Sequence, residues 1–251
     1  MVQSFSFILF FLGLVLGSFY NVVGLRVPVK KSIVWPRSSC PRCGRVLTPF
    51  ELIPFLSYLF QKGKCRGCSA PVSPLYPTME LLTGVLFAGS PLLVGWSEEL
   101  IIAFALNSLL VIITVTDLSY MVIPDRILLF FAVVFLILHL FFPTITWWDA
   151  ISGAAVGFSS LLFIAIISRG GMGGGDIKLF AVIGLAIGVK SVLLSLFFAT
   201  LYGAIVGILF IFIGVFEKGK PVPFGPFIAL GTLTAFFFGD GILSWYFTLF
   251  Y

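Results

Sequence analysis

Long hydrophobic stretches alternate with short polar or glycine-rich segments along the whole chain. Because about 20 consecutive apolar residues form a helix that can cross a bilayer, this pattern predicts an all-α, polytopic bundle of membrane helices. We expect eight spans. They are Ser4–Leu25, Thr78–Trp96, Leu100–Thr116, Ile127–Phe142, Ala150–Ser168, Ile177–Gly188, Ser191–Phe216 and Gly225–Phe250.

The first and sixth predicted spans differ from an ordinary transmembrane segment. The first, within residues 1–25, has no basic residue at its start and exceeds the apolar region of about 7–15 residues in cleaved signal peptides. We interpret it as a retained transmembrane helix. The sixth segment is short and directly follows a glycine run. It is either a thin, tilted span or the continuation of a glycine loop that dips into the membrane, where protein or water must satisfy the backbone.

Composition agrees with this interpretation, because 60% of the residues are hydrophobic and only 10% are charged. Soluble domains carry about 25% charged residues. The predicted surroundings are therefore a lipid bilayer. The formal net charge is only +5 and no recognition motif for nucleic acid occurs, so nucleic-acid binding is not expected.

The basic residues predict the orientation. Residues 26–77 hold nine Lys and Arg residues and one acidic residue, Glu51. If this segment is cytoplasmic, eight alternating spans place 14 of the 15 basic residues on the same side, and only Lys190 lies outside. Cytoplasmic loops carry such an excess of positive charge. We divide the chain into a first helix at 1–25, a cytoplasmic loop at 26–77 and a membrane core at 78–251.

All four cysteines lie in the basic loop. Cys40 and Cys43 form one C-x2-C pair, Cys65 and Cys68 form another, and 21 residues separate the two pairs. Two such turns can supply four thiolates to a tetrahedral Zn²⁺, about 2.3 Å from each sulfur. A reducing cytoplasm disfavours disulfides, and four ligands leave no open coordination position. We predict a structural zinc; redox pairs or unligated thiols are the alternatives.

Most other isolated polar residues have structural interpretations. The only histidine, His139, is expected to pack against a neighbouring helix. Asp125 and Asp149 occupy positions where an aspartate can cap a helix. Glu80 begins the second span, where a negative charge interacts favourably with the helix dipole. Solvated counter-charges are expected at Glu51, Glu98, Glu99 and Glu217.

The positions of Asp117 and Asp176 indicate a chemical rather than a structural role. Asp117 ends the third span, where the helix dipole opposes a negative charge. Asp176 follows Gly173, Gly174 and Gly175, and glycine permits close approach of another segment; a helix cap is the alternative for Asp176. The predicted topology brings both carboxylates to the cytoplasmic face. If they meet, they share a proton, so that one can activate water while the other donates to a scissile carbonyl, as in aspartic proteases.

Nearly the whole chain resembles the type IV prepilin peptidases, which belong with the presenilins to the G-x-G-D class of intramembrane aspartyl proteases. The stretches "GSFYNVVGLRVP" and "VSPLYPTMELLTG" resemble conserved parts of the family, and "CPRCG", "IPFLSYL" and "CRGC" resemble its zinc loop. "DLSYMVIPD" matches the first aspartate motif, "GMGGGDIKLFA" the G-x-G-D motif, and "PFGPFIALG" the entry to the last helix. Ser69 departs from the pattern, since many relatives have glycine there.

The resemblance implies an enzyme of the bacterial inner membrane, with its zinc loop and active site on the cytoplasmic side. Such enzymes cleave the basic leader of prepilins or prepseudopilins after a glycine, for type IV pili or type II secretion. They then usually N-methylate the new terminal residue with S-adenosylmethionine. No residue pattern in the chain indicates the methyl-transfer site by itself, and Glu80 and the loop are its candidates.

Two other functions are compatible with parts of the sequence. Intramembrane carboxylates also mark proton paths in transporters and channels, but no internal repeat of the kind found in many transporters is visible. A non-catalytic scaffold built on the zinc loop would not need Asp117. A cleavage assay on a prepilin-like peptide distinguishes the peptidase from both.

Overall fold

The computed structural model describes residues 2–168, 171–213 and 222–250, and the described chain is helical with two isolated β-bridges. It divides into two compact units, residues 1–95 and 96–251. Five described helices are long and apolar enough to cross a membrane. They are α1 (Val2–Arg26), α4 (Glu99–Tyr120), α6 (Trp147–Ile167), α7 (Gly174–Phe212) and α8 (Gly225–Phe250).

The first unit is built on the helix pair α1 and α3 (Leu75–Leu93). Their backbones approach closely because α1 carries glycine at the contact: a Cβ on Gly13 or Gly17 would lie within 2.8 Å of backbone atoms of α3. Asn21, only 1% exposed, donates from its side chain to the Tyr76 carbonyl at 3.1 Å. The intervening loop contains the 3-10 turn η1 (Pro49–Leu52) and the short helix α2 (Leu56–Phe60).

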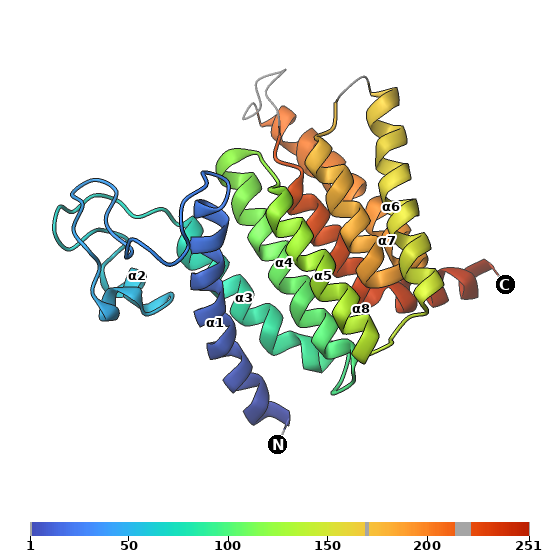
Figure 1. Ribbon diagram of the computed structural model, residues 1–251, viewed down its shortest axis with the longest axis horizontal. Coiled ribbons are helices and arrows are strands. Elements are labelled where there is room, and N and C mark those ends of the chain that lie inside the picture. Colours follow the sequence, from blue (N-terminus) through green and yellow to red (C-terminus); the bar gives the residue numbers. More distant parts are fainter. Residues whose placement is uncertain (1, 169–170, 214–221, 251) are drawn as a thin grey trace. The chain divides into compact units, whose positions relative to one another are not determined.

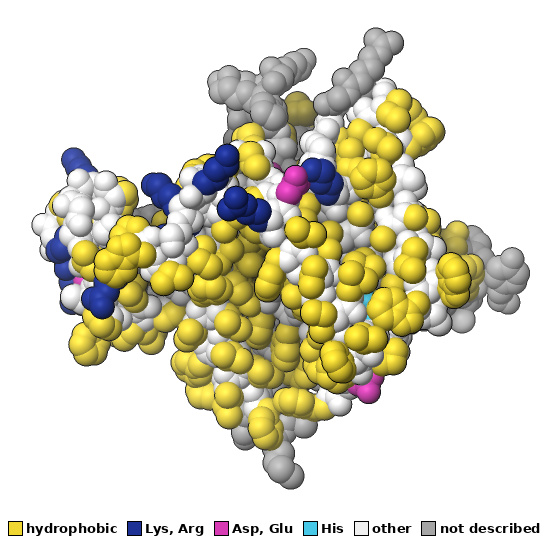
Figure 2. Space-filling view, viewed as in Figure 1, with side chains coloured by type: hydrophobic (Ala, Val, Ile, Leu, Met, Phe, Trp, Pro, Cys, Tyr) yellow, Lys and Arg dark blue, Asp and Glu magenta, His cyan; other side chains and the backbone are white. Residues whose placement is uncertain are grey.

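In the second unit α4 is the most deeply buried of the membrane-length helices. Helices α5 (Asp125–Phe141) and α8 pack against it, and α7 packs between α6 and α8 (Figure 1). Figure 2 shows hydrophobic side chains over much of the visible face of α5 and α6. Exposed side chains such as Leu129, Phe130, Phe163 and Ile166 would be unfavourable in water and agree with contact to lipid.

The predicted span count is not confirmed. Helices α3 and α5 form at the predicted second and fourth positions, but they are not among the five membrane-length helices. The predicted sixth and seventh spans join into α7, whose 39 residues correspond to about 58 Å of ideal helix. Gly188, with φ 76° and ψ 179°, interrupts the helical backbone between them. The basic residues Arg169, Lys218 and Lys220, and also Glu217, lie outside the described residues.

The cap assignment at Asp149 and the packing prediction at His139 can be compared with the structure. Thr146, not Asp149, caps α6, because its hydroxyl accepts from the Asp149 N–H at 3.2 Å. The Asp149 carboxylate instead accepts from the Val189 N–H, at the interruption of α7. His139 packs as expected: it is 2% exposed, and its Nε2 contacts the Leu185 carbonyl at 2.9 Å.

Candidate active site and metal centre

Asp117 lies in the last turn of α4, and its side chain points at the start of α8. It is 6% exposed, and its Oδ2 accepts a hydrogen bond from the Gly225 N–H at 2.7 Å. Gly225 is the first residue of α8, where unpaired N–H groups and the helix dipole stabilise negative charge. The end of α4 does oppose a charge on Asp117, as the sequence predicts, but the start of α8 offsets this opposition.

Asp176 lies in the first turn of α7 and is half-buried. It is not the helix cap: that position is Gly173, which has extended backbone and no side chain to bond the helix. The Asp176 side chain interacts electrostatically with Asp117. The structure therefore brings together the two carboxylates that the sequence singles out. Asp117 lies against the first turn of α8, and Asp176 lies in the first turn of α7.

The glycines of this site differ in what surrounds them. A Cβ on Gly175 would lie 2.8 Å from Cβ of Ile123, and one on Gly225 would lie 2.8 Å from Oδ2 of Asp117. A Cβ on Gly173 would approach the Asp176 carboxylate at 3.0 Å, whereas one on Gly174 would meet nothing within 4 Å. Close packing therefore favours glycine at Gly225, beside Asp117, and at Gly175, against the loop before α5. Gly174 is unconstrained, and a Cβ on Gly173 would require only a small shift of the Asp176 side chain.

Gly225 is a site residue that the sequence interpretation missed. The stretch "PFGPF" contains a glycine before a helix-starting proline, which is a signal for a helix N-terminus. Nothing in that local signal indicates that the N–H group would contact a carboxylate from α4.

Asp125 is the first residue of α5, and Pro124 occupies the cap position without a side-chain bond. The predicted helix cap is therefore wrong. Both carboxylate oxygens of Asp125 instead accept from Lys178 Nζ at 2.8 Å. Both side chains are exposed, so the pair contributes about 0–1 kcal/mol to stability. It joins the start of α5 to the first turns of α7.

The four cysteine sulfurs lie within 4.8 Å of one another, close enough to hold one metal ion. The two C-x2-C turns have the same hydrogen bonds: Cys40 N–H donates to Arg45 and Cys65 N–H to Ala70, while Gly44 and Ser69 donate back to the first cysteine of each turn, all at 2.9 Å.

Backbone groups also favour the thiolate at the first cysteine of each pair. The N–H groups of Cys68 and Gly67 lower the pKa of the Cys65 thiol to about 6, and the N–H groups of Cys43 and Arg42 likewise lower the pKa of Cys40. A metal ion prefers thiolates, so the donor set fits the predicted four-sulfur zinc site.

Glu51 is a structural part of the loop rather than a solvated counter-charge. Its side chain is 2% exposed and accepts from Arg45 at 2.5 Å and from the Thr48 N–H at 2.9 Å. These hydrogen bonds lower the pKa of Glu51 to about 2. Arg45 lies just after the first cysteine pair, so the ion pair ties the metal-binding turn to η1.

Glu80 of α3 is 8% exposed and binds the backbone of the same loop. Its Oε2 accepts from the Phe55 N–H at 2.7 Å, and the Ser18 side chain also bonds to it. Phe55 has φ 61° and precedes α2. The predicted helix-dipole role is therefore wrong: α3 begins at Leu75 and has no acidic residue in its first turn. Glu80 instead holds the backbone at the start of α2.

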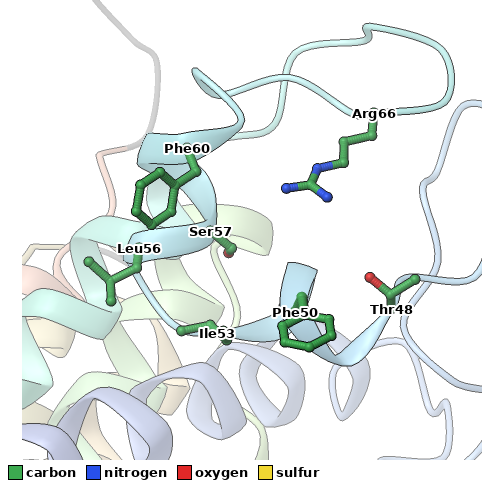
Figure 3. Close-up of a pocket in the computed structure, with 7 residues that line it drawn as sticks. All are labelled: Thr48, Phe50, Ile53, Leu56, Ser57, Phe60 and Arg66. Atoms are coloured by element: carbon green, nitrogen blue, oxygen red, sulfur yellow. The ribbon is translucent and has the colours of Figure 1, made fainter.

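A groove of about 540 Å³ lies between η1 and α2 (Figure 3). The Arg66 side chain reaches into this space from the second C-x2-C turn, and the Phe50 and Phe60 rings border it (Figure 3). Both rings are more than three-quarters exposed. The lining residues are Thr48, Phe50, Ile53, Leu56, Ser57, Phe60 and Arg66.

Fold and site together define a helical membrane protein with a paired-carboxylate site and a four-cysteine loop. Two family models match the chain: the bacterial peptidase A24 N-terminal domain over residues 11–93 and the type IV leader peptidase family over residues 104–208. The chain belongs to the type IV leader peptidase family.

Three relatives are similar over most of this chain. A protein of Bacillus subtilis named prepilin leader peptidase/N-methyltransferase is 50% identical over 239 residues, covering 95% of this chain and 96% of that protein. Proteins of the same name from Myxococcus xanthus and Aeromonas hydrophila are 42% and 34% identical, covering 82% and 97% of this chain and 63% and 94% of theirs. No solved structure matches significantly.

Proposed function

We propose that this protein is a membrane-embedded aspartic endopeptidase that removes the leader of type IV prepilins or prepseudopilins after a glycine. Asp117 and Asp176 are its catalytic pair. The position of Asp176 within electrostatic range of Asp117, in a chain of the leader peptidase family, is the observation that carries the proposal.

A backbone N–H favours the ionised form of each carboxylate: Gly225 bonds to Asp117 at 2.7 Å, and Gly173 bonds to Asp176. We assign the base to Asp117, which lies against the start of α8, and the acid to Asp176. Asp117 takes a proton from water, the hydroxyl attacks the scissile carbonyl carbon, and protonated Asp176 donates to the carbonyl oxygen. When the tetrahedral intermediate collapses, the C–N bond breaks and Asp117 returns its proton to the leaving amine.

The finer topology is also part of the proposal: eight spans, both termini outside and residues 26–77 in the cytoplasm of the bacterial inner membrane. The interruption at Gly188 supports two spans within α7, because about 58 Å of helix far exceeds a hydrocarbon core of about 30 Å. The ion pair between Lys190 and Asp240 at 2.6 Å fits with the outer side predicted for Lys190, since Asp240 lies in the second half of α8. Reporter fusions at Val72 and Tyr251 test the assignment, and cytoplasmic activity at Tyr251 would contradict it.

We further propose that the protein N-methylates the new terminal residue, using S-adenosylmethionine held in the loop groove. Bound there, the cofactor supplies an electrophilic methyl group. The Arg66 guanidinium can bind its carboxylate, and Phe50 and Phe60 can stack on the adenine or face the sulfonium cation. Arg66 belongs to the second C-x2-C turn, so a structural zinc there would hold it in place. Glu80 supports this site through the Phe55 backbone.

Mass spectrometry of a prepilin co-expressed with this protein tests both activities at once. The wild type should yield a shortened, methylated product. Arg66→Ala and Phe60→Ala should yield shortened product with less methyl group, because the groove is altered while the carboxylate pair is intact. An uncut prepilin would contradict the peptidase assignment, and full methylation in both variants would exclude the groove.

A further inference from the structure

The interruption of α7 exposes two backbone groups that two neighbouring helices satisfy. In an unbroken α-helix the Val189 N–H would donate to the Leu185 carbonyl. Here Gly188 has ψ 179°, which turns the next N–H out of the helix. That N–H donates to Asp149 Oδ1 of α6 at 3.1 Å. The Leu185 carbonyl contacts His139 Nε2 of α5 at 2.9 Å; a carbonyl only accepts, so this nitrogen carries the proton.

Such replacement matters because Gly188 and the His139 ring are buried. His139 is 2% exposed, and its ring lies edge-on to Trp147 with centroids 6.4 Å apart. A buried backbone group without a hydrogen-bond partner is destabilising. Each side chain therefore makes the interruption tolerable in one specific arrangement.

Glycines allow α6 and α7 to approach closely beside this interruption. A Cβ on Gly188 would collide with the Asp149 carboxylate, and Cβ atoms on Gly153 and Gly184 would collide with the backbone of the facing helix. The segment around Gly184 and Gly188 is thus packed directly on the α6 backbone. The same half of α7 carries Asp176 at its start, roughly 20 Å from Gly188 at the rise of an α-helix.

We propose that His139 and Asp149 are positioning residues for catalysis, which set the direction and depth of the first half of α7 and thereby place the Asp176 carboxylate beside Asp117. This inference rests on the proposed peptidase activity for its kinetic consequence. The two residues touch neither carboxylate; they act through the backbone at Leu185 and Val189.

The test uses the full-length protein in detergent with a prepilin-like peptide. Asp149→Ala and His139→Leu each remove one replacement bond, and each should lower kcat about tenfold or more with KM within about threefold, because small misplacement of a catalytic group is costly. Asp149→Asn retains an oxygen that accepts from Val189 and should restore most of kcat. Asp240→Ala removes a carboxylate paired with nearby Lys190 and is the matched control.

Hydrogen exchange supplies a measurement that does not depend on activity. In Asp149→Ala and His139→Leu the amides of residues 176–192 should exchange faster, while those of α4 and α8 keep wild-type rates. Wild-type kcat in both variants, or faster exchange spread evenly over the whole unit, would overturn the inference. If the wild type itself does not cut prepilin, the proposed function fails, and local exchange still decides whether these residues hold the segment.

Discussion

The carboxylate of Asp117 accepts a hydrogen bond at 2.7 Å from the backbone N–H of Gly225, 108 residues further along the chain. This bond places the start of the last helix at the candidate active site. It also explains how a buried carboxylate is tolerated at the end of α4, where that helix's own dipole opposes it.

Substitution of the glycines around the two aspartates by alanine should affect cleavage to different degrees. Gly225→Ala and Gly175→Ala should abolish most cleavage, because their Cβ atoms would lie 2.8 Å from Asp117 and Ile123. Gly174→Ala should keep near wild-type activity, because nothing lies within 4 Å of its added methyl group. Initial cleavage rates at equal amounts of inserted protein measure this order. A Gly174→Ala enzyme as inactive as Gly175→Ala would contradict it.

Replacement of either catalytic aspartate should abolish cleavage without unfolding the protein. Asp117→Asn and Asp176→Asn should each be inactive in the peptide assay, and the double variant should be no worse, because one shared proton makes the pair a unit. Asp125→Ala is the internal control: it loses only an exposed ion pair with Lys178 and should keep much of the activity. An active Asp117→Asn beside an inactive Asp125→Ala would reverse the assignment.

The four-cysteine loop should hold one zinc per chain. Metal analysis of purified protein should give one equivalent, and Cys40→Ser or Cys65→Ser should lower it. These variants should lose methylation more than cleavage, since the second turn carries Arg66 into the groove and the aspartates belong to the other compact unit. Purified protein with no zinc and two disulfides would refute the site.

Exchanging the residues at equivalent positions of the two metal-binding turns, Gly44 and Ser69, should change the stability of the loop in opposite directions. Gly44 has φ 71° and Ser69 has φ 56°, a conformation that costs a residue with a side chain about 1–2 kcal/mol. Ser69→Gly should therefore stabilise the loop by up to about 1 kcal/mol after the entropy cost of glycine. Gly44→Ser should weaken it, although its added Cβ meets nothing within 4 Å. Zinc retention against a chelator measures both; equal changes would contradict a backbone effect.

The Glu51 ion pair should make loop stability depend on acid pH. The pKa of Glu51 is lowered to about 2 from 4.5, so its stabilising contribution is full above about pH 4.5 and is lost as the pH falls towards about 2. The difference in Tm between the wild type and Glu51→Gln should therefore shrink over that interval. Metal loss in acid affects both proteins and cancels in the difference. A constant difference would argue against the paired carboxylate.

Much of this protein could be predicted from the sequence, because hydropathy and ligand spacing are local properties. A run of apolar residues specifies a helix wherever it lies, and each predicted span is helical over most of its described residues, although only five described helices are long and apolar enough to cross a membrane. The C-x2-C turns likewise determine their own geometry, so Cys40, Cys43, Cys65 and Cys68 meet as expected. The scarcity of charge made Asp117 and Asp176 conspicuous before any fold was known.

Only the tertiary structure decided the partners of the polar groups. The sequence shows that Asp125 and Asp149 begin helices, but it does not show that one pairs with Lys178 and the other bonds to Val189. It also treats the glycines before Asp176 alike, although a Cβ is excluded at Gly175 and not at Gly174. These outcomes depend on which helix backbones pack against each other. In a dry interior each polar group must find a partner nearby, and packing brings that partner from residues dozens of positions away.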